Sequence, residues 1–259
     1  MQMDNSHISN LNGSAPKIER VRHELKRRLL TVASVENTTP GMLRIEFAGE
    51  DLADFVSLAP DDHIKVFVPG PGGEMERRDY TPRRYDNDAR TLVIDFAIHE
   101  AGPVTQWALA ANVGDRLEIG GPRGSAVISN DIKNWLLIGD ETALPAIGRR
   151  IEEAGGDAHI TAIVAVADDA EHQVLRSQAR VTMHWAHRPL SQATDASALM
   201  SILRSVELAA GTFVWIAAEA SVTRALRTYL VEERGYPLSW IKASGYWVKG
   251  KADTTEKFE

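Results

Sequence analysis

The chain has 259 residues, enough for two domains of ordinary size, and its 44% hydrophobic and 25% charged residues are typical of a globular protein. The formal net charge of −7 gives no global signature of nucleic-acid binding, so an anionic substrate would need a local basic patch. The absence of cysteine excludes disulfides, thiol catalysis and cysteine-ligated zinc or iron–sulfur centres.

The N-terminal segment is polar and rich in Asn and Ser, and it lacks the apolar stretch of a secretory signal. No apolar run in the chain approaches the roughly 20 residues that span a bilayer. We therefore expect residues 1–16 to form a disordered arm, and we expect a cytoplasmic protein that binds neither membrane nor nucleic acid.

Short β-type runs follow, separated by turns of Gly, Pro, Asp and Asn. The predicted strands cover residues 29–35, 42–47, 63–68, 92–98 and 116–120. Several short strands in succession predict an antiparallel barrel or sandwich, to which we assign residues 17–130.

The pattern changes near residue 130, where apolar strands begin to alternate with helical segments. We expect strands at 135–138, 160–167, 181–186, 212–217 and 240–246, and helices at 143–154, 171–178, 196–209 and 221–234. This alternation predicts an α/β nucleotide-binding domain at 131–250, with a parallel sheet and helices on both faces. The charged residues 251–259 are expected to be a mobile tail.

One hexapeptide of the β half, residues 78–83, reads as an extended segment. Because side chains alternate along a strand, Arg78 and Tyr80 share one face, while Thr81 and Arg83 lie along the other. A phosphate-binding guanidinium, an aromatic wall and a hydroxyl donor are what a flavin nucleotide needs. An ordinary strand with a surface tyrosine and two solvated arginines fits the hexapeptide as well.

Three further segments combine glycine turns with possible anion sites. The Gly102-Pro103 turn precedes a predicted helix, whose N-terminus is a ready anion site. Arg123 lies in a glycine turn at residues 120–125. At residues 136–145 an apolar strand, a polar turn and a helix follow one another, as at the nucleotide site of an α/β domain, although only one glycine is present. Taken alone, the first segment also reads as a plain strand-turn-helix junction and the second as a surface turn.

Taken together and in this order, the motifs resemble those of the siderophore-interacting proteins, the FAD-dependent ferric-siderophore reductases of the ferredoxin-NADP reductase-like superfamily. The resemblance runs from about residue 21 to residue 250. It rests on residues 78–83 (RDYTPR), 120–125 (GGPRGS), 139–147 (GDETALPAI), 218–221 (AEAS) and 244–247 (SGYW).

The resemblance implies a Greek-key barrel that holds FAD non-covalently and an α/β domain that engages NADH or NADPH. Tyr80 would lie against the isoalloxazine, Thr81 near its reactive edge, and the arginines on phosphate or flavin carbonyls. The residues that fall on the flavin segments are Arg78, Tyr80, Thr81, Arg83, His99, Gly102, Val104, Thr105 and Trp107. Those on the nicotinamide side are Gly139, Asp140, Glu141, Thr142 and Glu219.

The implied reaction passes hydride from the nicotinamide to the flavin and single electrons to Fe(III), releasing Fe(II), with no catalytic residue beyond the flavin. Ferric siderophores are often anionic, and Lys65, Arg123 and Lys242, with Lys249 as a fourth, are our candidates for attracting one. Each also reads as an ordinary solvated cation.

Four more residues bear on metals and on the donor. His184 and His187 point to opposite faces of a strand, so we expect no metal site there. Asp168 and Asp169 end the second α/β strand, where an acid binds a ribose hydroxyl and favours NADH, whereas the family includes NADPH users, so the donor stays open.

Two rival functions remain beside a monomeric reductase. One is an electron-transfer component for another redox protein; the absence of cysteine argues against the version with a cluster. The other is a flavin-containing siderophore-binding protein without turnover.

Overall fold

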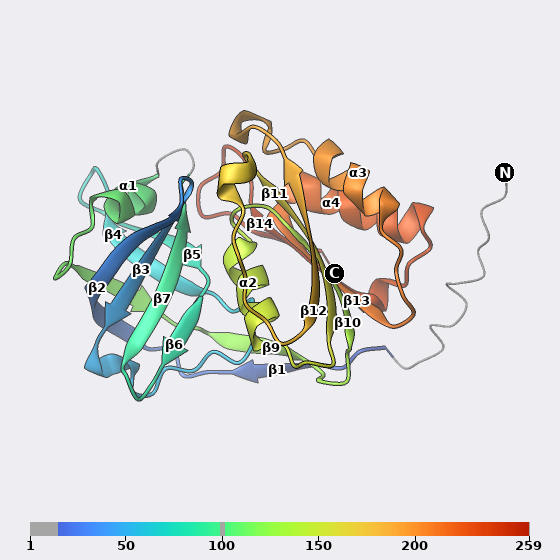
Figure 1. Ribbon diagram of the computed structural model, residues 1–259. Helices are drawn as coiled ribbons and strands as arrows, with labels where there is room; N and C mark the ends of the chain where they lie inside the picture. The colour runs from blue at the N-terminus through green and yellow to red at the C-terminus, as the bar shows by residue number, and fades with distance from the viewer. Residues whose placement is uncertain (1–14, 99–101, 259) are drawn as a thin grey trace, which may run out of the picture.

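The computed structural model describes residues 15–98 and 102–258, which form two sheet-centred halves lying side by side (Figure 1). Most of the predicted N-terminal arm, and the candidate His99, lie outside the described residues. Within the described ranges, no helix combines the length and the apolar character that crossing a membrane requires.

The first half is a seven-stranded sheet in which all neighbouring strands are antiparallel, with the order β5-β4-β8-β2-β3-β7-β6. The inward side chains of β2 are buried at alternate positions, as expected for a strand with one face on the core. The predicted antiparallel barrel is thereby confirmed. The strands are β2 (Arg27–Thr39), β3 (Met42–Ala48), β4 (Ile64–Pro69), β5 (Met75–Tyr80), β6 (Arg84–Asp86), β7 (Thr91–Ala97) and β8 (Arg116–Gly120).

Three shorter elements complete this half. Helix α1 (Pro103–Ala110) begins with proline, a residue suited to the first helical turn. A two-stranded ribbon pairs β1 (Ile18–Arg22) with β9 (Gly124–Ile128). The ribbon was not predicted, and β1 runs along the base of the molecule, below both halves (Figure 1).

The second half is a six-stranded sheet with the order β12-β11-β10-β13-β14-β15. Its first five strands are parallel, which confirms the predicted α/β domain. Strand β13 is buried along its whole length, because helices cover both faces of the sheet. The strands are β10 (Asn134–Gly139), β11 (His159–Val166), β12 (Arg180–His187), β13 (Thr212–Glu219), β14 (Ile241–Trp247) and β15 (Glu256–Phe258).

The helices divide between the two faces. Helix α2 (Leu144–Glu153) lies between the second sheet and the barrel, whereas α3 (Ser197–Ser205) and α4 (Ala220–Thr228) lie on the opposite face (Figure 1). Seven of the ten residues of α2 are buried, because the helix packs against both halves. From β10, the strands β11 and β12 follow toward one edge of the sheet, and β13 and β14 then follow toward the other edge. The strand order therefore reverses between β10 and β13, and nucleotides bind at the carboxyl ends of the strands beside such a point.

The helix predicted at 171–178 does not form. A short 3-10 turn, Asp169–Glu171, is followed by irregular chain up to β12. Glu171 accepts a hydrogen bond from Thr39 of the barrel at 2.6 Å, and Ser177 donates to the Ile151 carbonyl at 2.5 Å. These two anchors hold the segment against its neighbours and override its local helix propensity.

The C-terminal tail, predicted to be mobile, is ordered through Phe258. Strand β15 pairs antiparallel with β14, and Asp253 accepts hydrogen bonds from Lys65 at 2.7 Å and Arg77 at 3.1 Å. The tail was mispredicted because its stability comes from a sheet edge and from cations far away in the sequence.

Candidate cofactor and substrate site

Two segments of the barrel predicted to bind flavin meet at Tyr80. The Tyr80 ring, at the end of β5, lies 4.6 Å from the Phe96 ring, and its hydroxyl is hydrogen-bonded with Thr105 in the first turn of α1. Burial raises the pKa of Tyr80 to about 12, against the opposing effects of Thr105 and Arg78. The phenol is therefore neutral at physiological pH and offers an uncharged aromatic face.

The beginning of α1 leaves room for a ligand. A Cβ added to Gly102, the N-cap residue, would meet none of the described atoms within 4 Å. Val104 and Thr105 are buried below this turn, and Trp107 stacks on Phe47 with ring centroids 6.3 Å apart. Open space at a helix N-terminus fits an anionic group such as a diphosphate.

Arg78 is the cation on the same strand as Tyr80. Its half-buried guanidinium donates to the Glu76 carboxylate at 2.8 Å and to the Arg77 carbonyl at 2.6 Å. Thr81, the next candidate, is buried. Because a guanidinium carries five donors, Arg78 keeps donors for a phosphate beside these two contacts.

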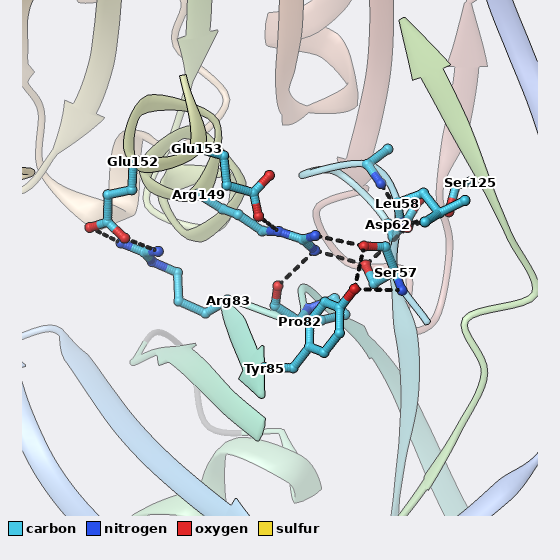
Figure 2. Close-up of polar contacts among 11 residues, drawn as sticks. Ser57, Leu58, Asp62, Pro82, Arg83, Tyr85, Ser125, Arg149, Glu152 and Glu153 are labelled. Atoms are coloured by element: carbon cyan, nitrogen blue, oxygen red, sulfur yellow. Dashed lines mark hydrogen bonds and ion pairs between the residues drawn. The ribbon is translucent and has the colours of Figure 1, made fainter. Parts of the chain in front are cut away.

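Arg83 points toward Glu152 of α2 (Figure 2). It is buried and makes a bidentate contact with Glu152 of α2, at 2.8 and 2.6 Å, while Asp95 lies 3.5 Å away. The guanidinium thus connects the barrel to the second half. Its predicted flavin role stays a prediction, and the contacts seen in the structure are with Glu152 and Asp95.

Arg149 of α2, which sequence reasoning missed, is the second arginine between the halves (Figure 2). Its buried guanidinium donates to the Ser57 hydroxyl at 2.7 Å, the Ser57 carbonyl at 2.8 Å and the Pro82 carbonyl at 3.1 Å. Pro82 directly follows Thr81, so Arg149 holds α2 against the end of the flavin motif. No pattern in the sequence distinguishes Arg149 from the neighbouring Arg150.

Asp140 joins three neighbouring parallel strands at their carboxyl ends. One carboxylate oxygen accepts from the Thr142 amide at 2.9 Å and hydroxyl at 2.6 Å. The other accepts from the Glu219 amide at 2.9 Å and the Trp247 indole at 3.0 Å. The carboxylate orders the ends of β10, β13 and β14, and its acceptor sites are already used.

Glu219 and Gly139 have similar structural roles at this edge. Glu219 caps α4, where its carboxylate accepts from the Ser221 amide at 2.6 Å and the Val222 amide at 3.3 Å. A side chain on Gly139 would approach the Ala217 carbonyl to 2.8 Å, so only glycine fits. The structure thus brings the predicted nicotinamide-side residues together. Gly139 allows the close approach of the backbone at this edge, and Glu219 caps the helix that follows β13.

Glu141 and Arg188 form a buried ion pair at the same edge, with the guanidinium donating to the carboxylate at 2.9 Å. Burial, followed by the nearby Asp140, raises the pKa of Glu141 to about 7, although Arg188 opposes the shift. Among the described residues, the Arg188 Nη1 atom is buried and has no hydrogen-bond partner. A buried donor without a partner fits a phosphate oxygen of a dinucleotide.

Sequence reasoning missed Arg188. Its position in the chain could have indicated it, because Arg188 directly follows the last residue of β12, at the carboxyl edge of the sheet where α/β domains bind nucleotides.

The four candidate substrate cations are not all in one place. Lys65 contacts Asp79 at 3.0 Å and Asp253 at 2.7 Å. Lys242 contacts Asp61 at 2.6 Å, so its charge lies close to the segment 61–65, which contains Lys65. Burial alone would raise the pKa of Asp61, but the Lys242 charge and the hydrogen bonds from Lys242 and Trp215 hold that pKa below its ordinary value.

The other two candidates differ from this pair. Arg123 is exposed in the turn after β8, whose Gly120 pairs with Lys65, so it lies at the same end of the sheet. Lys249 donates instead to the Ser191 carbonyl, 3.1 Å away, beyond the end of β12. Lys65, Lys242 and Arg123 thus come near the 61–65 segment, whereas Lys249 contacts the chain after β12, and a substrate role for all four stays a prediction.

The sequence predicted no metal-ligating group. The structure places one ligand atom each of Asp169, His172 and His187 within 4.8 Å of one another. Fifteen positions separate the two histidines, so no short motif announced the cluster.

Comparison with known proteins agrees with this geometry. A family model described as siderophore-interacting protein matches residues 132–250, and one described as siderophore-interacting FAD-binding domain matches residues 31–77 and 73–126. The chain is 33% identical to a protein named NADPH-dependent ferric-chelate reductase from Escherichia coli K12, over 92% of this chain and 99% of that protein. The chain belongs to the siderophore-interacting protein family.

Two other similarities extend this assignment. A ferric vibriobactin reductase of Vibrio cholerae is 28% identical over 86% of this chain and 90% of that protein. The crystal structure of a siderophore utilization protein from T. fusca superposes with a TM-score of 0.83, at 36% identity, over 92% of this chain and 98% of that chain. The seven-stranded half is accordingly the FAD-binding domain of this family member, and FAD is its cofactor.

Proposed function

We propose that this protein is a ferric-siderophore reductase that passes electrons from NAD(P)H through non-covalently bound FAD to the ferric complex and releases Fe(II). The observation that carries the proposal is the contact between the two halves at Pro82. Tyr80 and Thr105 bring the flavin segments of the barrel together, and Arg149 of α2 binds the Pro82 carbonyl. The dinucleotide half is thereby held directly beside the flavin motif, as electron transfer between two cofactors requires.

The side chains and backbone of the protein bind and orient the two cofactors. Bound FAD would supply the change from a two-electron donor to a one-electron acceptor. Arg78 and the open turn at Gly102 hold phosphate charge, while the neutral Tyr80 ring forms an apolar wall. The Nη1 group of Arg188, which has no hydrogen-bond partner among the described residues, would bind a phosphate oxygen of NAD(P)H. No proton transfer by a side chain is needed, which agrees with the absence of a predicted catalytic dyad.

The proposed substrate is an anionic ferric siderophore. Lys65 and Arg123 lie at one end of the barrel sheet, and Lys242 of β14 contacts Asp61 of the barrel, but carboxylates already balance the two lysines. An anionic complex would therefore displace carboxylates such as Asp253 and take their place on the cations.

We propose NADPH as the physiological donor. Asp168, which together with Asp169 suggested NADH, caps the 3-10 turn after β11 by accepting from the Ala170 amide at 2.8 Å, and this use competes with a ribose hydroxyl. The Escherichia coli relative is named as NADPH-dependent, which agrees with this choice.

The test is anaerobic stopped-flow absorbance on the flavin-loaded protein. We expect NADPH to bleach the flavin faster than NADH, and a ferric catecholate then to restore the oxidised spectrum while a chromogenic Fe(II) chelator detects product. Reduction by NADPH without Fe(II) release would instead support the electron-transfer component, and binding of the ferric complex without either step would support a binding protein.

We also propose that the enzyme is a cytoplasmic monomer, because NAD(P)H is supplied there and the two halves of one chain complete the site. Cell fractionation and light scattering of the purified protein test these two points.

A further inference from the structure

The carboxyl ends of β11 and β12 hold a cluster of possible metal ligands that the proposed reaction does not use. His187 is the last residue of β12 and pairs in register with Val166, the last residue of β11. Asp169 and His172 come from the short turn that follows β11. Two strands of the rigid sheet therefore bring the three side chains together.

The three ligand atoms converge on one point. The Nε2 atoms of His172 and His187 are 2.8 Å apart, and Oδ1 of Asp169 lies 3.6 Å from the first and 3.4 Å from the second. Protein ligands about 2.0–2.2 Å from a tetrahedral zinc ion lie roughly 3.3 Å from one another. The two distances to Asp169 match this spacing, and the two imidazole nitrogens need to separate by about 0.5 Å.

The surroundings hold the ligands in place. The His172 ring stacks on Trp185 with ring centroids 4.6 Å apart and an angle of 13° between the planes. Asp168 accepts from the Ala170 amide, and Glu171 accepts from Thr39 of the barrel, so both ends of the turn are anchored. Preorganised ligands lose little conformational entropy when an ion binds.

The local charge favours a cation. Asp168, Asp169 and Glu171 place three carboxylates within four residues of chain beside the two imidazoles. Such a turn repels phosphate, whereas a neutral imidazole pair with one carboxylate suits divalent ions from iron to zinc. The exposed position of Asp169 leaves coordination sites open to water.

We propose that Asp169, His172 and His187 form a binding site for a divalent first-row transition-metal ion. The inference does not depend on the proposed reductase activity, because it rests on this cluster alone.

The test uses the full-length, flavin-loaded protein, freed of metal with a chelator and titrated with ZnCl₂ by isothermal titration calorimetry in a buffer without phosphate. We expect one equivalent of Zn²⁺ to bind and the unfolding temperature to rise, since a ligand that binds only the folded state stabilises it. The saturable phase should be lost in His172→Ala and in His187→Ala, and weakened in Asp169→Asn.

The matched control is His184→Ala, a histidine of the same strand on its opposite face, which should bind zinc as the wild type does. Circular dichroism checks that each variant is folded. Absence of saturable binding in the wild type would mean that the two imidazoles merely share a proton, and would overturn the proposal. Stoichiometric binding retained in both His172→Ala and His187→Ala, or lost equally in His184→Ala, would also overturn it.

Discussion

At the scale of single residues, the candidate site consists largely of charges that already have partners. Arg78 contacts Glu76, Lys65 contacts two aspartates, and Glu141 contacts Arg188. An anion at Lys65 would therefore exchange one charged partner for another, whereas Arg78 and Arg188 keep donors beside their present contacts.

Arg78→Ala should purify with much less FAD than the wild type while remaining folded. Charge-assisted hydrogen bonds contribute about 1.5–3 kcal/mol, so we expect FAD affinity to fall roughly 10- to 100-fold. Flavin content and fluorescence titration measure this loss. Arg77→Ala is the matched control, because Arg77 lies on the opposite face of β5 and contacts Asp253. Full flavin occupancy in Arg78→Ala would refute the phosphate role.

Glu141 should make stability depend on pH. Burial raises its pKa from 4.5 to about 7, so between these values the folded protein binds a proton that the unfolded chain does not. The free energy of unfolding contributed by this group therefore falls as pH rises through that window and levels off above about pH 7. Glu141→Gln should flatten the dependence and be no less stable than the wild type near neutral pH.

Unfolding temperatures of the two proteins, measured by calorimetry at intervals between about pH 5 and pH 8, test this sign. An unchanged slope, with Glu141→Gln clearly less stable at the upper end, would show that the carboxylate is net stabilising through Arg188.

At the scale of elements, α2 is the piece that holds the two halves together. Its Arg149 donates to Ser57 and Pro82 of the barrel, and its Glu152 receives Arg83 (Figure 2). The helix is buried on nearly all sides as a result. The Pro82 carbonyl accepts from Arg149, whereas the Ser57 carbonyl accepts from both Arg149 and the Tyr85 hydroxyl, so loss of Arg149 affects Pro82 most.

Arg149→Met should destabilise the protein by on the order of 3 kcal/mol, because it removes three buried hydrogen bonds and leaves the Pro82 carbonyl without its donor. It should also slow flavin reduction by NADPH, since α2 is no longer held at Pro82. Thermal unfolding and stopped-flow reduction measure the two effects. Glu153→Gln, which changes only the half-exposed partner of Arg149 at 2.6 Å, serves as the control and should alter neither strongly.

At the scale of the whole molecule, the net charge of −7 opposes the approach of an anionic substrate, so any attraction must be local. In our proposal this attraction comes from Lys65 and Arg123 at one end of the barrel sheet and from Lys242 of β14, which contacts Asp61 of the barrel. The C-terminal tail reduces it, because Asp253 contacts both Lys65 and Arg77.

Raising the salt concentration should therefore lower kcat/KM for an anionic ferric catecholate, since such fields are screened within roughly 8–10 Å at physiological ionic strength. Lys65→Ala, Arg123→Ala and Lys242→Ala should lower it too, with flavin reduction near normal. Asp253→Asn should raise it, and Asn accepts the left-handed backbone at this position, where φ is 48°.

A neutral ferric chelate is the control substrate in the same steady-state assay, and it should respond much less to each change. Equal losses for the neutral and the anionic complex would assign these cations to the fold or the flavin site.

The sequence by itself determined the features that depend on short stretches of neighbouring residues. Period-2 and helical patterns located most strands and helices, and the change of pattern near residue 130 separated an antiparallel half from a parallel α/β half. The segments proposed to bind flavin and nucleotide lie at strand ends and helix starts, because such positions are encoded locally.

Only the tertiary structure decided which partner each charged side chain takes. Arg83 contacts Glu152 across 69 positions of sequence, Arg188 contacts Glu141 across 47, and Lys65 contacts Asp253 across 188. The ordered tail and the cluster of Asp169, His172 and His187 are decided in the same way. Local periodicity carries no information on such pairs, because they form only when packing of the two halves brings distant segments within hydrogen-bond reach.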